Sequence, residues 1–364
     1  MKKVGILTIT DGANYGNRLQ NYAMQVLLTS LDLDVETIQR ETPRDKHGIV
    51  LLKYLVKENI KRLIGRKNTY FALRERKRKF LEFNRKYIKF SNVCLSNNQA
   101  PEGLKNQYDY FICGSDQIWN YALTEGLHPA YFLDFARSDQ RKIAYAPSIN
   151  QTPIATQMKP QLVEKLESFS AISVREQDAA QQLTLWMHRS ISAVLDPTLL
   201  LQASDYTPLV EKYSVQFPEH YIFIYCLHLN HLPFLRQYAE AYANSHNAKI
   251  VYCNKYDLRE APYAVNIFRY GPEAFVSGIK NADYIIADSF HAAALSIIFQ
   301  KNFVIYAPDG CPSRMNTLFS SLGIGNRFIT DIHQALPEIP YDNVNQNLSC
   351  LREASLDYLK NALE

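Results

Sequence analysis

The chain has 364 residues, 47% of them hydrophobic, which is enough for about two ordinary domains with a core each and excludes an intrinsically disordered protein. The apolar run at the amino terminus stops at Asp11, which is too short for a signal peptide or a membrane-spanning helix. The six cysteines are scattered without a CxxC pair, which fits a reducing compartment. These features predict a globular, cytoplasmic protein.

The net charge of +4 conceals a strongly basic segment. Residues 53–89 contain 14 Lys or Arg and three acidic residues, a local excess of 14 − 3 = +11, so the rest of the chain carries 4 − 11 = −7. Aromatic residues recur there at spacings of three and four, which predicts an amphipathic helical insertion within residues 50–90. One interpretation is a solvated basic face whose aromatic residues enter the core. The other is attraction to a polyanion, and since no nucleic-acid module accompanies the segment, we predict peripheral contact with an anionic membrane and no nucleic acid.

Strand and helix patterns alternate along the first 200 residues. Short apolar runs predict the strands, and apolar positions at helical spacing predict the helices. The predicted strands are residues 4–10, 35–39, 108–113, 142–146, 171–174 and 192–195, and the predicted helices are residues 19–31, 158–169 and a helix from 178 onward. This alternation predicts a parallel sheet with helices on both faces.

The pattern loosens around Pro208 and Pro218, so we place a domain junction between residues 203 and 220. A second alternating set follows. Its predicted strands are residues 221–227, 249–253, 284–287 and 303–306, and its predicted helices are residues 231–245, 272–281, 289–299, 315–322 and 348–363. The predicted fold is α/β, with two Rossmann-like doubly wound domains facing across a cleft. The predicted units are residues 1–202, residues 203–340, and a terminal helix within 341–364 that packs back on the first domain.

A glycine-bearing loop follows the first predicted strand. Gly12 and Gly16 lie close together in a chain with only 13 glycines, which indicates a backbone requirement. The loop is short of a full GxGxxG motif and alone only weakly indicates a nucleotide site. Its amides, with Asn14, Asn17 and Arg18, suit sugar hydroxyls or a phosphate.

The most informative stretch is the turn from the predicted strand at 284–287 into the following helix. Such a turn aims unpaired N–H groups and the positive end of the helix dipole at one point, which favours an anion. Asp288, Ser289 and His291 stand there. A histidine at this place often only hydrogen-bonds to a strand end, but ligands bind at the carboxyl ends of strands in open α/β sheets. Asp288 and His291 have no third ligand close in sequence, so we predict no metal.

Five separated motifs combine these features. They are Asn14-Tyr15-Gly16-Asn17 with Gln20-Asn21-Tyr22-Ala23, Gly114-Ser115-Asp116-Gln117-Ile118-Trp119-Asn120, Ser173-Val174-Arg175-Glu176, Leu195-Asp196-Pro197-Thr198-Leu199-Leu200, and Asp288-Ser289-Phe290-His291-Ala292. Together they resemble the polysaccharide pyruvyl transferase family, and the second is the most specific. The resemblance implies a glycosyltransferase-B-like fold and transfer of pyruvate from phosphoenolpyruvate onto two hydroxyls of one sugar, which leaves a cyclic ketal. It also implies a lipid-linked or polymeric glycan acceptor and no cofactor besides the donor substrate.

The same resemblance places the catalytic histidine at His291 and a donor-binding arginine at Arg175. One position departs from the family, whose members commonly carry an arginine two residues before the histidine, where this chain has Ser289. The donor would lose one charge-assisted contact, worth about 1.5–3 kcal/mol. Arg314, after the next predicted strand, is our candidate for the missing charge. The predicted donor-binding residues are therefore Arg175, Asp288, Ser289 and Arg314.

The chemistry sets the remaining roles. Adding a sugar hydroxyl to the enol carbon requires a proton for the methylene carbon, and histidine is the side-chain type that changes protonation near neutral pH. We therefore predict His291 as the proton donor. Asp116 is either the base for an acceptor hydroxyl or a turn residue. The predicted acceptor-binding residues are Asn14, Asn17, Arg18, Ser115 and Gln117.

Two rival functions stay open at this level. The first is a nucleotide-sugar glycosyltransferase, because a fold does not determine the chemistry performed on it. The second is a non-catalytic glycan-binding relative, which the serine at position 289 favours.

Overall fold

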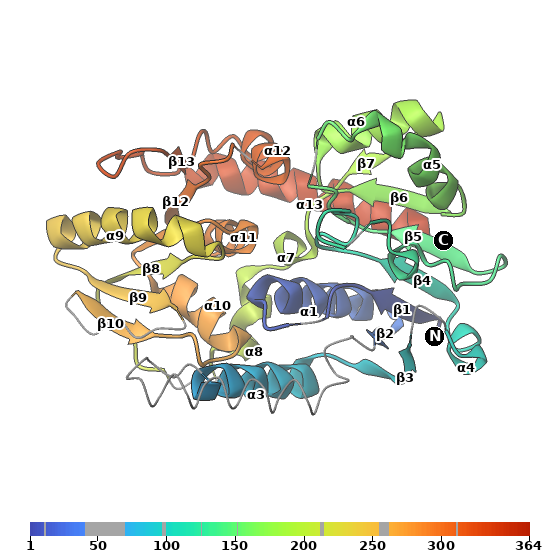
Figure 1. Ribbon diagram of the computed structural model, residues 1–364, viewed down its shortest axis with the longest axis horizontal. Coiled ribbons are helices and arrows are strands. Elements are labelled where there is room, and N and C mark those ends of the chain that lie inside the picture. Colours follow the sequence, from blue (N-terminus) through green and yellow to red (C-terminus); the bar gives the residue numbers. More distant parts are fainter. Residues whose placement is uncertain are drawn as a thin grey trace.

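The computed structural model describes residues 1–10, 12–40, 70–96, 100–124, 126–150, 152–211, 215–254, 262–310 and 312–364. They form two parallel β-sheets in two lobes (Figure 1). Each sheet buries side chains on both faces. In the second sheet, for example, Phe223 belongs to the large core on one face, whereas Ile222 and Ile224 belong to a separate core on the other. The predicted class, two Rossmann-like domains with helices on both faces of each sheet, is confirmed.

The first sheet has seven strands in the order β3-β2-β1-β4-β5-β6-β7. They are β1 (Lys3–Leu7), β2 (Asp34–Arg40), β3 (Phe90–Leu95), β4 (Tyr110–Cys113), β5 (Arg141–Ala144), β6 (Ala171–Val174) and β7 (Ser192–Ala193). The helices of this part are α1 (Tyr15–Ser30), α3 (Tyr70–Tyr87), α4 (Glu102–Lys105), α5 (Lys159–Glu167), α6 (Gln177–Met187), α7 (Pro197–Leu200) and α8 (Thr207–Val210). Because all neighbouring strands are parallel, the loops that follow β1, β4 and β6 start from the same edge of the sheet.

The second sheet has six strands in the order β10-β9-β8-β11-β12-β13. They are β8 (Tyr221–Tyr225), β9 (Lys249–Cys253), β10 (Tyr263–Asn266), β11 (Tyr284–Ala287), β12 (Asn302–Tyr306) and β13 (Phe328–Ile329), with helices α9 (Leu232–His246), α10 (Pro272–Asn281), α11 (Phe290–Ile298) and α12 (Ser313–Leu322). Strand β11 is buried along its whole length between β8 and β12. The loops after β8, β11 and β12 therefore start side by side.

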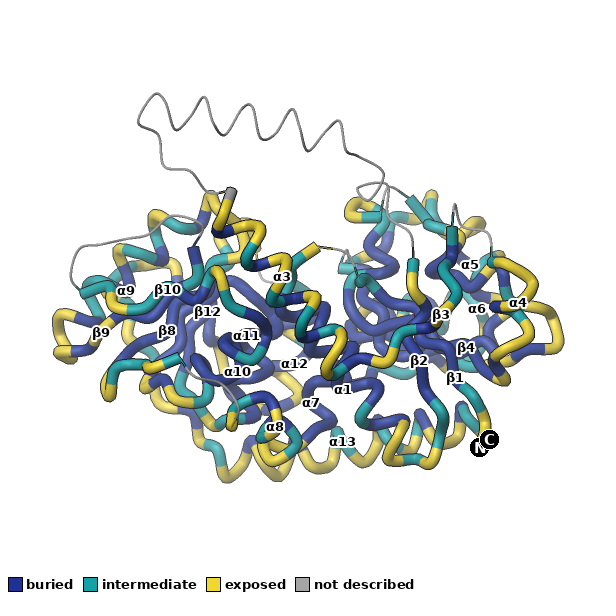
Figure 2. Tube along the Cα trace, turned by 90° about the horizontal axis from the view of Figure 1, so that it is seen from below, coloured by how far each residue is buried: buried dark blue, intermediate teal, exposed yellow. Residues whose placement is uncertain are grey.

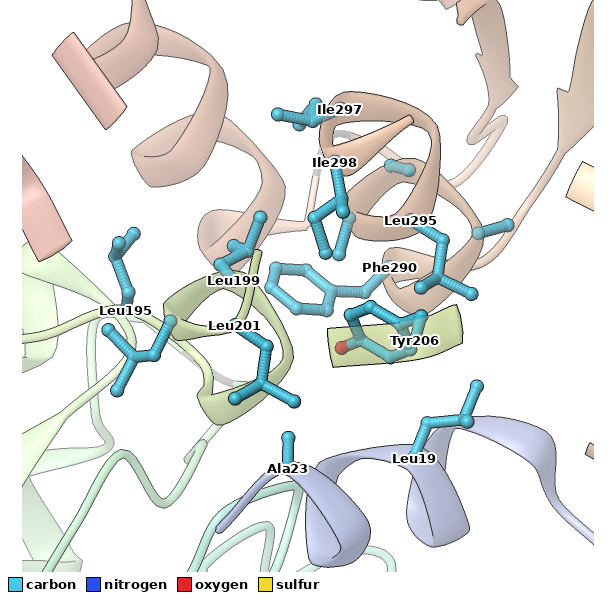
Figure 3. Close-up of a cluster of buried hydrophobic side chains, with 14 of the residues drawn as sticks. Leu19, Ala23, Leu195, Leu199, Leu201, Tyr206, Phe290, Leu295, Ile297 and Ile298 are labelled. Atoms are coloured by element: carbon cyan, nitrogen blue, oxygen red, sulfur yellow. The ribbon is translucent and has the colours of Figure 1, made fainter. Parts of the chain in front are cut away.

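One apolar core continues from the first domain into the second. Leu19 and Ala23 of α1, Leu199 of α7, and Phe290 and Leu295 of α11 belong to one buried cluster, and Figure 3 shows how these helices meet. This packing fixes the start of α11 against α1. It therefore places residues of the second domain beside the loop that follows β1.

The terminal helix α13 (Tyr341–Leu363) runs along both domains, and both chain ends lie at the first domain (Figures 1 and 2). Its Arg352 donates to the carbonyl oxygens of Leu199 and Leu201, and Tyr358 donates to that of Ala144. The helix thus joins the end of the chain to α7 and to the first sheet.

Several predicted boundaries were wrong. The first strand ends at Leu7 and not at residue 10, and α1 begins at Tyr15 because the Asn14 side chain accepts a hydrogen bond from the Asn17 amide and caps the helix. Helix α13 begins at Tyr341, not at residue 348. Strands β3, β10 and β13 were not predicted. All three are edge strands, and β3 and β10 pair with register shifts. Their sequences therefore lack a regular alternation of apolar and polar residues.

Only the second half of the basic insertion, from residue 70, lies within the described residues. There α3 buries Phe80 and Phe83, while Arg76 donates to the Tyr15 hydroxyl and to the carbonyl oxygens of Ala13 and Phe268. The opposite face of α3 exposes basic residues together with Phe71, which is 63% exposed. Helix α3 therefore has a basic solvated face and aromatic residues in the core, as the first interpretation of the insertion expects. Contact with a membrane stays a prediction. None of the helices in the described part of the chain is long and apolar enough to cross a bilayer.

Candidate active site between the two domains

His291 lies where β11 turns into α11, and its ring rests against the first turn of α1 from the other domain. Only 8% of the residue is exposed. Gly16 makes this contact possible, because a Cβ on Gly16 would lie 2.1 Å from Nδ1 of His291. Ser289 occupies the N-cap position of α11, as predicted, but its side chain makes no capping hydrogen bond. The requirement for glycine at position 16 is thus the space that His291 occupies.

Replacing Gly16 with alanine should displace the His291 ring. We expect turnover to fall about 10-fold to 100-fold, because a shift of about 1 Å in a reacting group has an effect of that order. The free energy of unfolding should fall by about 1–3 kcal/mol through overpacking. Steady-state kinetics and urea unfolding measure the two effects. Gly103→Ala is the matched control, because a Cβ there meets nothing within 4 Å, and equal behaviour of the two variants would contradict the assignment.

Asp196 is the fully buried acid next to His291. It caps α7, where Oδ1 accepts the amide and hydroxyl hydrogens of Thr198. Its Oδ2 lies 3.1 Å from Nη2 of Arg175 and 3.8 Å from Nε2 of His291. Burial raises the pKa of Asp196, but the charge of Arg175 and the proximity of His291 outweigh burial and hold that pKa well below its ordinary value. Asp196 therefore stays ionised and lies within reach of both groups.

The loop after β4 adds Ser115 and Asp116. Asp116 has a left-handed backbone (φ +69°), and its Oδ2 accepts a hydrogen bond of 2.6 Å from Nδ2 of Asn17. Its Oδ1 lies 3.6 Å from Nη2 of Arg175. Ser115 is fully buried, and its hydroxyl donates to Asp196 and accepts from Arg175. This side chain therefore positions Arg175 and Asp196, and its predicted contact with the acceptor stays a prediction.

Two buried arginines lie close to this cluster. Arg175 has its guanidinium carbon 5.0 Å from the ring centroid of Phe290. Arg314, at the start of α12, donates to Asn150 and, with the Gln117 amide oriented to suit it, to Gln117. Burial and the like charge of Arg175 lower the pKa of Arg314 to about 10, so it remains charged at neutral pH. Within the described residues, Nη1 of Arg175 and Nε of Arg314 have no hydrogen-bond partner, and neither does Nε2 of His291.

A cavity of about 740 Å³ opens beside these arginines, between the domains. Of the predicted site residues, Gln117, Asp288 and Arg314 line it. His291, Asp116 and Arg175 are not in this lining and are at most 8% exposed, and Arg175 and Arg314 together line a smaller cavity of about 90 Å³. Loops of both domains contribute to the lining of the larger cavity, which also includes Asn150, Asp178, His228, His231 and Tyr306. The structure thus brings the donor-side residues together around Arg314.

Some predicted residues have other partners. Asn14 caps α1, and Arg18 donates to the carbonyl oxygens of Thr10 and Gly12 and lines a different cavity, next to α3. Asp288 does not point at His291. Its carboxylate accepts hydrogen bonds from the amides of Leu227 and His228 in the loop after β8. The predicted direct contacts of these three residues with a substrate stay predictions.

Asp196, His228 and His231 were missed as site residues. Asp196 lies inside one of the five motifs, and its position after a short strand and before Pro197 was the available signal. The two histidines follow a predicted strand with a His-x-x-His spacing. Neither sequence pattern shows which buried group the side chains contact, so neither predicted a site residue.

Comparison with solved structures defines the class of the fold. The chain matches UDP-GlcNAc 2-epimerase from Methanocaldococcus jannaschii with a TM-score of 0.52 at 10% identity, covering 96% of this chain and 92% of that one. UDP-N-acetylglucosamine 2-epimerase from Rickettsia bellii gives a TM-score of 0.52 at 11% identity, with coverages of 99% and 96%. An alpha-glucosyltransferase in complex with UDP and a 13-mer DNA gives 0.50 at 9% identity, with coverages of 98% and 95%. At these identities the likeness shows the fold alone, which is the two-domain glycosyltransferase-B-like fold.

The family follows from the sequence. A family model described as polysaccharide pyruvyl transferase matches residues 14–310. The chain therefore belongs to the polysaccharide pyruvyl transferase family and is a transferase. A comparison with curated proteins finds no match.

Proposed function

We propose that the protein transfers pyruvate from phosphoenolpyruvate onto two hydroxyls of one sugar in a cell-surface or exopolysaccharide precursor. The observation that carries this proposal is the pair Arg175 and Arg314. Both guanidinium groups are buried, and each keeps one N–H group unpaired among the described residues although Asp196 already pairs with Arg175, so both still require a hydrogen-bond acceptor. A donor that carries both a phosphate and a carboxylate satisfies this requirement.

The buried groups also suit the reaction. His291 donates a proton to the methylene carbon of phosphoenolpyruvate, and the first sugar hydroxyl bonds to the enol carbon as its own proton passes to Asp116. The second hydroxyl then bonds to the same carbon as the C–O bond to phosphate breaks and its proton passes to the leaving phosphate, which closes the cyclic ketal. Arg175 and Arg314 stabilise the charge of the leaving phosphate. Asp196, which stays ionised, lies 3.8 Å from Nε2 of His291 and holds Arg175 beside it.

Ligand-dependent heat stability tests the proposal. Only a true ligand of the folded protein raises the melting temperature by mass action, so phosphoenolpyruvate should protect and UDP-sugars should not. Release of phosphate from phosphoenolpyruvate should then require mixed glycan precursors. Protection by UDP-sugars alone would instead support a nucleotide-sugar glycosyltransferase. Binding of glycan without either donor would support a non-catalytic relative.

Arg314 replaces, on this proposal, the arginine that family members commonly have in place of Ser289. Arg314→Ala should weaken donor binding about 10-fold to 150-fold, the equivalent of about 1.5–3 kcal/mol for one charge-assisted contact, and should affect acceptor binding less. Arg314→Lys should recover only part, because lysine lacks the planar fork. Calorimetry with phosphoenolpyruvate measures both variants. The control is Arg137→Ala at an exposed arginine paired with Asp139. Unchanged affinity in Arg314→Ala would remove this residue from the donor site.

The exposed face of α3 carries the proposed membrane contact. Arg74 and Lys77 are exposed there near Phe71. Binding to anionic vesicles should fall as salt rises past physiological strength, where the Debye length is about 8 Å, and should drop in an Arg74→Glu, Lys77→Glu variant. Vesicle co-sedimentation measures it. Equal binding to neutral and anionic vesicles would exclude an electrostatic contact.

A further inference from the structure

Two histidines converge on Asp288 at the wall of the cleft cavity. The loop after β8 carries His228 and His231, and the buried Asp288 lies at the end of the adjacent strand β11. Oδ2 of Asp288 lies 3.1 Å from Nδ1 of His228 and 3.0 Å from Nδ1 of His231. These three ligand atoms all lie within 4.8 Å of one another.

Hydrogen bonding alone does not account for this convergence. The amide of His228 also points at Oδ2 of Asp288, at 2.9 Å, so three nitrogen atoms surround one carboxylate oxygen. A carboxylate oxygen has two lone pairs, so it accepts two hydrogen bonds of good geometry. The third nitrogen is left without a good partner if all three carry hydrogen. A cation between Oδ2 and the two Nδ1 atoms removes this conflict, because both imidazoles then present lone pairs.

We propose that His228, His231 and Asp288 bind a divalent transition-metal ion, with Zn²⁺ as the reference ion. Two imidazole nitrogens and one carboxylate oxygen are the ligand set of many open zinc sites, which bind at about 2.0–2.2 Å. The two separations between Oδ2 and the Nδ1 atoms, 3.1 and 3.0 Å, need to widen by only a few tenths of an ångström to fit ligands around a tetrahedral ion of that size. The sequence-based expectation was no metal, because no third ligand lies close to Asp288 and His291 in sequence; His228 and His231 precede Asp288 by 60 and 57 residues.

The surroundings of the three side chains are those of a supported metal site. Oδ1 of Asp288 accepts the amide of Leu227, which fixes the carboxylate, and Nε2 of His231 lies 4.0 Å from Oδ2 of Asp309. This distance is longer than a hydrogen bond and Asp309 is exposed, so Asp309 is a carboxylate near the far ring nitrogen of His231 and not a bonded partner of it. Asp309, like the three proposed ligands, lines the 740 Å³ cavity. The remaining coordination position therefore faces the space where a substrate enters.

Arg314 lines the same cavity. If the proposed function holds, the ion and Arg314 bind one anionic group of the donor, a phosphate or a carboxylate, between them. The ion thereby supplies a second positive charge to the cavity that Arg314 lines. This role rests on the proposed function, whereas the metal site itself does not.

Metal binding without substrate tests the site. After treatment with a chelator, the full-length protein is titrated with Zn²⁺ by calorimetry and with Co²⁺ by visible absorption. We expect one equivalent to bind, a Co²⁺ spectrum of a four-coordinate or five-coordinate site, and much weaker binding of Mg²⁺. His228→Ala changes a half-exposed side chain and should leave the fold intact. It should weaken Zn²⁺ binding at least about 100-fold, and so should Asp288→Asn.

His246→Ala is the control, because His246 is an exposed histidine at the end of α9, away from the three ligands. Circular dichroism of each metal-free variant checks the fold. Zn²⁺ affinity that is absent in the parent protein, or equal in the parent and in His228→Ala, would overturn the site. Since no substrate is present, these outcomes do not depend on whether phosphoenolpyruvate is the donor.

Discussion

Replacing His291 with alanine should lower turnover about 10²-fold to 10⁴-fold, which is the usual contribution of a positioned general acid. The ring lies against Gly16, with Nε2 facing Asp196 and without a hydrogen-bond partner among the described residues. A buried donor atom that no protein group uses is available to a substrate. Phosphate release with phosphoenolpyruvate and glycan acceptor measures the effect.

The fold of this variant should survive. Alanine removes a ring whose Nε2 has no hydrogen-bond partner among the described residues, and alanine itself is a good helix former within α11. His246→Ala serves again as the control and should keep parental turnover. A folded His291→Ala protein with near-parental turnover would sink the assignment. It would direct attention to His231, which lines the cavity between the domains.

The strand-to-helix turn around His291 could be predicted because all its determinants are local. An apolar run of four residues, a serine at the N-cap and an alanine-rich helical stretch each act over a few neighbours. The alternation of such units was enough to predict the parallel sheets and the two-domain fold. Short edge strands such as β3 and β13 lack this local pattern, since pairing with a neighbour defines them.

The contacts that build the site could not be predicted. Gly16 and His291 are 275 residues apart, and nothing local to either shows that one makes room for the other. In the sequence, Asp196 is simply the residue before Pro197. In the structure it caps the start of helix α7. Its second role depends on Arg175 and His291, which reach it from other elements. These partners are set by the meeting of α1, α7 and α11, which is a property of the domain interface.

The departure at Ser289 also has a structural context. Its side chain makes no capping hydrogen bond, and the neighbouring Asp288 turns away from His291 toward the loop after β8. On the proposed function, the charge on the donor side comes from Arg175 and Arg314, which belong to different domains. A donor bound between them would join the domains, so donor binding should be sensitive to both residues.

Arg175→Met should lower the free energy of unfolding at neutral pH by about 3–5 kcal/mol, because it leaves the fully buried carboxylate of Asp196 without its main counter-charge. Urea unfolding at pH 7 measures the loss. Adding Asp196→Asn to Arg175→Met should restore part of the stability, since the buried charge is then gone. Asp196→Asn alone should not stabilise the parent protein.

The pH dependence of the unfolding free energy tests the same interaction between Arg175 and Asp196. In the parent protein the pKa of Asp196 is lowered, so its contribution to stability is present above the ordinary carboxyl pKa of about 3.9 and is lost only as pH falls through the lower folded value. Without Arg175, burial dominates and the pKa of Asp196 should rise above about 3.9. The folded variant then binds a proton more tightly than the unfolded chain, so acidification from pH 7 to pH 5 should recover part of its lost stability. The difference in unfolding free energy between parent and variant should therefore shrink over that interval. A difference that stays constant, together with no recovery in the double variant, would show that Arg175 stabilises the fold by packing on Phe290 and not by neutralising Asp196.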